Sequence, residues 1–277
     1  MPELPEVEFG RQIAERVALG RRIEEVVCAQ DRIVFDQSSP KTVVAALRGA
    51  RVGAVSRRGK HLWFELDRRP WPIFHFGMTG AFRMRGVEPL HLASGITDDA
   101  WPPRFAKIHF HFDDGGELVM TNARRFGRIR LRDDPVSEPP IGSLGFDPLL
   151  DLPDARAFGV LLESRPRITL KGLLLDQRFA AGVGNWIADE VLFQARLDPR
   201  RPVGSLGAGE VRRLRTQLGR GVRTAVAAGA RSKRFPRNWL FHARWGRSKD
   251  ASLADGSPVR HLTVAGRTTA WVPSRQS

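Results

Sequence analysis

A proline-rich stretch, residues 133–153, divides the chain into two parts with different patterns. It contains Pro135, Pro139, Pro140, Pro148 and Pro153. Proline fixes its own φ angle and has no backbone N–H to donate, so clustered prolines interrupt helices and strands. At 277 residues the chain is also longer than most single domains. The sequence therefore predicts two domains, residues 1–133 and 154–277, joined by a linker over residues 134–153.

The first part has the pattern of one helix followed by short strands. Apolar residues recur at helical spacing over residues 5–19, with glutamates near the start, where the helix dipole favours acids. Strand patterns then follow over residues 22–133, for example at 60–66 and 107–112, with a turn at 113–116. Such a series is typical of a β-sandwich or barrel, and we expect a β-sandwich.

The second part is mainly helical and ends in a hairpin. Helical patterns cover residues 170–176, 186–195 and 209–228. Two strand-like runs, 259–264 and 267–272, flank Ala265-Gly266 and predict a β-hairpin. The predicted fold class is therefore α+β.

Charge predicts a polyanionic partner. The formal net charge is +15, with 42% hydrophobic residues, which indicates a folded basic protein. The arginines are spread along the chain and form no single basic amphipathic helix, which favours nucleic acid over a membrane surface. No apolar run is long enough to span a membrane, and the N-terminus lacks the pattern of a signal peptide. We expect a cytoplasmic protein, associated with the nucleoid if the source is bacterial.

Cysteine usage restricts the available chemistry. Cys28 is the single cysteine, which excludes an intrachain disulfide and any zinc site with two or more thiolates. We expect Cys28 to be a buried structural thiol. The seven histidines form no recognisable metal pattern, so we expect neither a metal nor a cofactor.

The N-terminus offers a nucleophile. Removal of Met1 would leave Pro2 as a secondary amine, with the carboxylates of Glu3 and Glu6 one and four residues away. An α-amino group has a pKa of about 8, and burial or a helix N-terminus disfavours its charged form. A neutral amine can attack an electrophilic sugar carbon. The same residues also fit a simple helix start, because proline and acids suit the first turn.

The segment Met1-Pro2-Glu3-Leu4-Pro5-Glu6-Val7-Glu8 resembles the start of the formamidopyrimidine-DNA glycosylase and endonuclease VIII family, with Leu4 as in the formamidopyrimidine branch. The resemblance extends over nearly the whole chain. It implies a bifunctional DNA glycosylase and AP lyase of base excision repair. Pro2 would displace the damaged base at C1′ and form a Schiff base, with Glu3 shuttling protons and Glu6 supporting the N-terminal turn. Successive β and δ eliminations would follow.

Two further motifs of the first part carry the resemblance to the family's site. Ser56-Arg57-Arg58-Gly59-Lys60 implies that Lys60 is a phosphate and general-acid group, and His75-Phe76-Gly77-Met78 implies that His75 contacts phosphate. By itself, Lys60 also fits a solvated surface lysine.

Two loops resemble those that fill the space left by a flipped nucleotide. An enzyme acting at the glycosidic bond of duplex DNA must extrude the nucleotide and plug the stack. Met78 would do so, together with the loop Asn122-Ala123-Arg124-Arg125-Phe126-Gly127. The resemblance implies that Arg124 faces the orphaned base and that Phe126 wedges the opposite strand. Taken singly, Met78 and Phe126 also fit core packing.

The second part resembles the family's helix-two-turns-helix motif at residues 170–176 and 183–190. It implies phosphate contacts from Lys171 and from Asn185, which stands at a predicted helix N-terminus. An ordinary helix hairpin capped by Asn185 is the alternative.

The segment from about residue 240 to 277 resembles the family's terminal zinc finger without its metal ligands. The positions of the four cysteines hold Ser252, Asp255, Val272 and Arg275, which cannot bind zinc tightly. The segment resembles the zincless form of the finger, which implies that Val264 and Trp271 hold the hairpin and that Arg267 grips a phosphate. Arg267 alone would also fit a solvated residue at a hairpin tip.

Substrate and partner expectations follow from the resemblance. The partner would be double-stranded DNA with a damaged base or abasic site, bound by a monomer. The chain is short between Gly229 and Gly246, so ring-opened purines, hydantoins or oxidised pyrimidines fit as well as 8-oxoguanine. A catalytically idle DNA-binding protein is the main alternative. RNA binding is a third reading, which gives no reason for Met78 and Arg124 to occur in paired loops.

Overall fold

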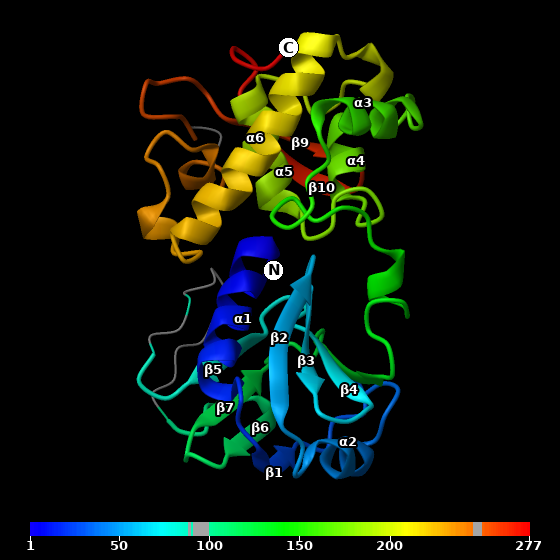
Figure 1. The fold of residues 1–277 in the computed structure, drawn as a ribbon. Helices are drawn as coiled ribbons and strands as arrows, with labels where there is room; N and C mark the ends of the chain where they lie inside the picture. Colours follow the sequence, from blue (N-terminus) through cyan, green and yellow to red (C-terminus); the bar gives the residue numbers. More distant parts are fainter. Residues whose placement is uncertain (88–89, 91–99, 246–250) are drawn as a thin grey trace. The chain divides into compact units, whose positions relative to one another are not determined.

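The computed structural model spans residues 1–277 and describes all of them except 88–89, 91–99 and 246–250 (Figure 1). The chain forms two compact units, Met1–Ser143 and Leu144–Ser277. The boundary between them falls inside the stretch predicted as a linker. The predicted α+β class, with an N-terminal β-sandwich and a C-terminal helix-two-turns-helix domain, is confirmed.

The first unit is a sandwich of two four-stranded antiparallel sheets. Four aromatic rings from both sheets meet in its core: Phe64 and Phe74 from one sheet, Phe82 and Phe110 from the other, with ring centroids 5.0 to 6.1 Å apart. Alternation along each strand places these rings inside and their neighbours on the opposite face, where Trp63 and Ile73 pack with Ile141. One sheet has the order β1-β6-β7-β5, from Ile23–Cys28, Ala106–Phe112, Glu117–Thr121 and Ala81–Met84. The other has the order β2-β3-β4-β8, from Val52–Arg58, His61–Leu66, Trp71–His75 and Arg128–Arg132.

Two helices accompany the sandwich. Helix α1 (Leu4–Ala18) packs against strands of both sheets and buries an apolar face with Val7, Ile13 and Val17. Helix α2 (Pro40–Leu47) was not predicted, because residues 22–133 were interpreted as strands throughout. The helix has a local start signal, because the Ser39 hydroxyl accepts a hydrogen bond from the Thr42 N–H at 3.1 Å and Pro40 occupies the first turn. The prediction of strands did not take this signal into account.

The second unit holds four α-helices and one hairpin. The helices are α3 (Ala155–Glu163), α4 (Leu170–Leu175), α5 (Asn185–Ala195) and α6 (Ala208–Ala227). Strands β9 (Arg260–Val264) and β10 (Arg267–Trp271) form the predicted hairpin, with Ala265 and Gly266 both at positive φ in the turn. Helix α3 was not predicted, although it has a local start signal: the Asp154 carboxylate accepts a hydrogen bond from the Ala157 N–H at 2.8 Å. Short 3₁₀ turns lie at Ile141–Ser143, Val203–Ser205, Ser232–Arg234 and Leu240–His242.

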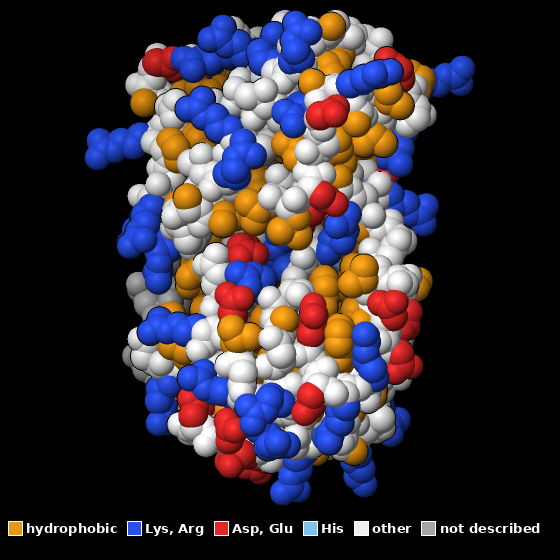
Figure 2. Space-filling view, viewed as in Figure 1, with side chains coloured by type: hydrophobic (Ala, Val, Ile, Leu, Met, Phe, Trp, Pro, Cys, Tyr) orange, Lys and Arg blue, Asp and Glu red, His pale blue; other side chains and the backbone are white. Residues whose placement is uncertain are grey.

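The structure also tests the expectations for Cys28 and for a membrane-spanning segment. Cys28 is half-buried at the end of β1, so the expectation of a fully buried thiol was wrong; burial nevertheless raises its pKa to about 12. Among the described residues, no helix has both the length and the apolar character needed to cross a membrane. Lysine and arginine side chains are scattered over the visible surface of both units, as the spread of arginine along the sequence indicates (Figure 2).

Candidate active site

The N-terminal turn of α1 encloses the predicted nucleophile. Pro2 and Glu3 are buried, whereas Met1 is 46% exposed. Glu3 is the N-cap residue, and Glu6 closes a capping box in which its carboxylate accepts a hydrogen bond from the Glu3 N–H at 2.8 Å. Burial and the nearby Glu3 carboxylate raise the pKa of Glu6 to about 8. Glu6 therefore holds a proton at neutral pH.

Lys60 lies in the tight turn between β2 and β3. The turn needs Gly59 at a positive φ of 57°. His61 follows directly and pairs with His75 across strands β3 and β4, with the two rings 4.8 Å apart. Burial is the main cause that lowers the pKa of His75 to about 4, and the positive charge of Lys60 is the second. Burial and the neighbouring His75 lower the pKa of His61 to about 3.

Hydrogen bonding sets the tautomer of His75. Its Nδ1 accepts the Gly77 backbone N–H at 3.2 Å, so in the neutral ring the proton is on Nε2. A neutral imidazole with a fixed Nε2–H can donate to a phosphate oxygen without adding charge. The structure thus brings Lys60 and His75 together on one sheet, one as a cation and the other as a neutral donor.

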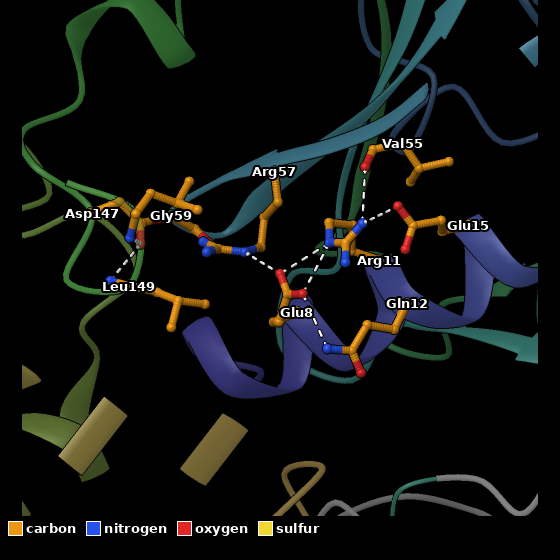
Figure 3. A network of polar contacts seen from close by, with 10 residues as sticks. Glu8, Arg11, Gln12, Glu15, Val55, Arg57, Gly59, Asp147 and Leu149 are labelled. Carbon is orange, nitrogen blue, oxygen red and sulfur yellow. Dashed lines mark hydrogen bonds and ion pairs between the residues drawn. The ribbon is translucent and has the colours of Figure 1, made fainter. Parts of the chain in front are cut away.

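A buried ionic network joins α1 to the turn that presents Lys60 (Figure 3). The Glu8 carboxylate accepts from Arg57 Nε at 3.0 Å and from Arg11 Nε at 2.9 Å. The Arg57 guanidinium also donates to the Gly59 carbonyl at 3.0 Å. The network therefore connects the helix that starts at the nucleophile with the residue just before Lys60. Sequence reasoning missed Glu8 and Arg57, which are 49 residues apart.

The two predicted void-filling loops are tied together by Asn122. This fully buried side chain donates to the Phe76 carbonyl at 2.8 Å and accepts the Gly127 N–H at 3.1 Å. The loops also touch at Gly77, where a Cβ would lie 2.3 Å from the Phe126 carbonyl carbon. Asn122 is a functional residue that sequence reasoning overlooked, although it opens the loop motif.

The side chains on these loops are available to a ligand. Phe126 is 51% exposed, which excludes the core-packing alternative for this residue, and Met78 is half-buried. The exposed Arg124 guanidinium lies 5.3 Å from the centre of the Phe126 ring. Loop tips that present an apolar ring and a cation have the composition needed to enter an opened base stack.

Lys171 departs from expectation. Its side chain is fully buried, and its Nζ lies 2.5 Å from Asp189 Oδ1 and 3.3 Å from the Thr268 carbonyl. Asp189 is itself fully buried, pairs with Arg244 at 2.7 Å and accepts the Ala270 N–H at 3.2 Å. A lysine held in this way does not reach the surface of this structure, and it connects α4 to α5 and to the hairpin. The phosphate contact expected of Lys171 stays a prediction.

Asn185 and Arg267 are placed on this same framework. Asn185 is the first residue of α5, after the N-cap Gly184, so the alternative in which Asn185 is the cap is wrong. Its Nδ2 donates to the Thr268 carbonyl at 2.9 Å, next to Arg267 at the exposed hairpin turn. Its Oδ1 is buried and accepts no hydrogen bond from the part of the chain that the structure describes.

The four positions expected to replace zinc ligands hold the finger by other means. Asp255 and Arg275 form an ion pair, Val272 is fully buried, and Ser252 forms a β-bridge with Pro258. Val259, Ala270 and Val272 pack with Phe193 of α5 in a small core, in which Val264 and Trp271 take no part. The first residues of the finger's predicted loop, 246–250, lie outside the described residues.

Two family models match the chain. One, described as the formamidopyrimidine-DNA glycosylase N-terminal domain, matches residues 1–129, and the other, described as the formamidopyrimidine-DNA glycosylase H2TH domain, matches residues 144–237. A formamidopyrimidine-DNA glycosylase of Arabidopsis thaliana is 40% identical over 278 residues, which cover 100% of this chain and 71% of that protein. One of Geobacter metallireducens is 31% identical over 282 residues, covering 100% of both.

Solved structures of Lactococcus lactis formamidopyrimidine-DNA glycosylase are also similar. One, bound to DNA containing an AP site, has a TM-score of 0.79 and 25% identity over 99% of each chain. Another, a mutant in complex with Fapy-dG containing DNA, has a TM-score of 0.80 and 26% identity over 100% of each chain. The chain therefore belongs to the formamidopyrimidine-DNA glycosylase family of bifunctional base-excision repair enzymes.

Proposed function

We propose that this glycosylase uses Pro2 as its nucleophile after Met1 has been removed, and that Glu3 and the protonated Glu6 assist it. The carrying observation is the enclosed N-terminal turn, with Glu3 buried and the pKa of Glu6 raised to about 8. A buried amine favours its neutral, nucleophilic form, which the structural alternative of a helix start does not require.

The proposed reaction begins at C1′ of the damaged nucleotide. The Pro2 nitrogen forms a bond to C1′ as the bond to the base breaks, and the departing base takes up a proton. Glu3 moves protons as the sugar ring opens and the Schiff base forms. Loss of a proton from C2′ then expels the 3′ phosphate, and a second elimination expels the 5′ phosphate. Glu6 keeps the amine and Glu3 in place through the capping box.

Phosphate contacts would come from both units. Lys60 supplies a charge and His75 an uncharged donor, because its pKa is lowered to about 4. In the second unit Asn185 and Arg267 are the proposed contacts, while Lys171 holds the hairpin that carries Arg267. Met78, Arg124 and Phe126 would fill the space left by the everted nucleotide.

The substrates we propose are oxidised bases in duplex DNA, including formamidopyrimidines, 8-oxoguanine, hydantoins and oxidised pyrimidines. Solved Lactococcus lactis complexes hold Fapy-dG and an oxidised pyrimidine in DNA. The short basic segment after α6 leaves less chain to cover a purine, which favours the smaller and ring-opened lesions. If the source organism is a bacterium, we propose that the enzyme acts at the nucleoid.

Blocking the N-terminus tests the proposal. One preparation carries an uncleaved N-terminal tag, and its control carries the same tag at the C-terminus. We expect the blocked protein to bind a lesion-containing duplex as tightly as the control but to cleave none of it. Equal cleavage by both would overturn Pro2 as nucleophile, and absence of cleavage from both would favour a catalytically idle binding protein.

A further inference from the structure

Three potential metal ligands meet on the outer face of the sheet β1-β6-β7-β5. His109 and His111 alternate along β6 with Ile108, Phe110 and Phe112, which belong to the sandwich core. The alternation places both imidazoles on the opposite face. Glu117 of β7 lies beside His111 in the strand register. One ligand atom from each of the three side chains lies within 4.8 Å of the other two.

The distances allow the three side chains to bind one ion after they adjust. His109 Nε2 lies 2.7 Å from Glu117 Oε2, and His111 Nδ1 lies 3.9 Å from the same oxygen. In a tetrahedral zinc site with bonds of about 2.0 to 2.1 Å, neighbouring ligand atoms stand about 3.3 Å apart. Each of these two contacts must change by about 0.6 Å, which a rotation of the glutamate side chain supplies. The three ligand atoms, which lie within 4.8 Å of one another, must also come together to this spacing through movement of the imidazoles.

The surroundings resemble those of a metal site. The Trp101 indole N–H donates to Glu117 Oε2 at 2.6 Å and so fixes the carboxylate, as outer partners orient metal ligands. Glu25 of β1 lies opposite His111 in the register and offers a second, exposed carboxylate. Two imidazoles and one carboxylate form a donor set that suits Zn²⁺ and its neighbours among the divalent transition metals.

We propose that His109, His111 and Glu117 bind one divalent transition-metal ion of the zinc type, with water or Glu25 as the fourth ligand. The ion would join β6 to β7 and to the segment that carries Trp101. Lys60 and His75 belong to the other sheet, so the ion would stabilise the first unit without entering the chemistry at Pro2. The site is unrelated to the four positions of the zincless finger, which belong to the second unit.

The first measurement is a titration of chelator-treated full-length protein with Co²⁺, followed by visible absorption, and with Zn²⁺, followed by calorimetry. We expect one equivalent to bind, with d–d bands typical of a low coordination number that disappear when Zn²⁺ displaces Co²⁺. We also expect Zn²⁺ to raise the Tm, since an ion that binds the folded state stabilises it.

Variants assign the binding to these residues. His111→Ala changes a partly exposed side chain and should lose the bound equivalent and the Tm increase, with unchanged circular dichroism. His242→Ala, in the second unit, should keep both. Trp101→Phe removes only the outer hydrogen bond and should weaken binding by about 10- to 100-fold. Absence of stoichiometric binding by the wild type, or full binding by both His111→Ala and Glu117→Gln, would overturn the proposal.

Discussion

In both units a buried carboxylate pairs with two cations, and Glu8 of the first unit differs from Asp189 of the second in how deeply its partners are buried. In the first unit Glu8 pairs with Arg57 and Arg11, and the Arg11 side chain is 20% exposed and has further partners in Glu15 and the Val55 carbonyl. In the second unit Asp189, Lys171 and Arg244 are all buried, and Asp189 also accepts a backbone N–H from the hairpin.

The difference indicates two ways of positioning a site. The Glu8 network leaves one cation partly hydrated, so water can compensate when a partner is lost. The Asp189 network connects α4, α5, the Arg244 segment and β10 without such compensation, in the finger that lacks zinc ligands. A buried ion pair is weak evidence of net stabilisation, but removing one of its members leaves an uncompensated charge and is costly.

The largest expected effect is that of Asp189→Asn. The substitution leaves two buried cations without their counter-charge, and we expect the free energy of unfolding to fall by about 3 to 5 kcal/mol. Urea denaturation measures it. Asp255→Asn, in the exposed pair with Arg275, is the control and should cost less than about 1 kcal/mol. Similar losses in both variants would show that burial does not distinguish the networks.

Glu8→Gln should have a smaller effect. The amide keeps the shape of the side chain but removes the charge that Arg57 and Arg11 share, at a cost of about 1.5 to 3 kcal/mol, since hydrogen bonds to charged groups have this strength. Strand cleavage should also slow because the turn before Lys60 is less firmly held. Glu15→Gln, which affects only the i,i+4 pair with Arg11, should change stability by about 0.5 kcal/mol or less. A Glu8→Gln protein as stable and active as Glu15→Gln would contradict this account.

A pH-dependent effect should come from the second unit, in addition to that of Glu6 in the first. Burial raises the pKa of Glu190, next to Asp189, from 4.5 to about 7. The folded state then holds a proton that the unfolded state releases, so stability present below pH 4.5 is lost as pH rises toward 7, by at most about 1.4 kcal/mol per pH unit. Glu190→Gln should reduce this slope in urea denaturation series between pH 4.5 and 7. An unchanged slope would refute the assignment.

The smallest expected effect concerns the salt dependence of DNA binding. Because Lys171 is buried against Asp189, Lys171→Met should weaken binding through a less ordered hairpin while leaving the slope of log K against log salt unchanged. Arg267→Met, at the exposed turn, should reduce the slope by about 1, as expected for a lost phosphate contact. A reduced slope for Lys171→Met would restore its phosphate role.

Sequence patterns predicted most of the elements, namely the N-terminal helix, the sandwich strands, three helices of the second unit and the hairpin. Helices α2 and α3 were missed; both are short, and their start signals are local caps at Ser39 and Asp154. A cap alone does not predict a helix when the surrounding pattern indicates strands or a linker.

Within the site, sequence motifs named the residues that would touch DNA but not those that hold them in place. Glu8 with Arg57, and Asp189 with Arg244, pair across 49 and 55 residues, which a single sequence does not reveal. Lys171 was assigned to phosphate because its motif gives a residue type but not its burial. The His109, His111 and Glu117 cluster depends on strand register and was missed for the same reason.

The central claim is that Pro2 carries the chemistry, and borohydride trapping tests it most directly. Untagged protein is mixed with borohydride and a duplex containing 8-oxoguanine opposite cytosine, with an abasic-site duplex in parallel, and the adduct is located by peptide mass. We predict a reduced adduct on the N-terminal peptide, at Pro2, with the abasic duplex. The same adduct should form with the 8-oxoguanine duplex if the short segment after α6 accommodates a purine. An adduct on Lys60, or no adduct with either duplex, would contradict the account.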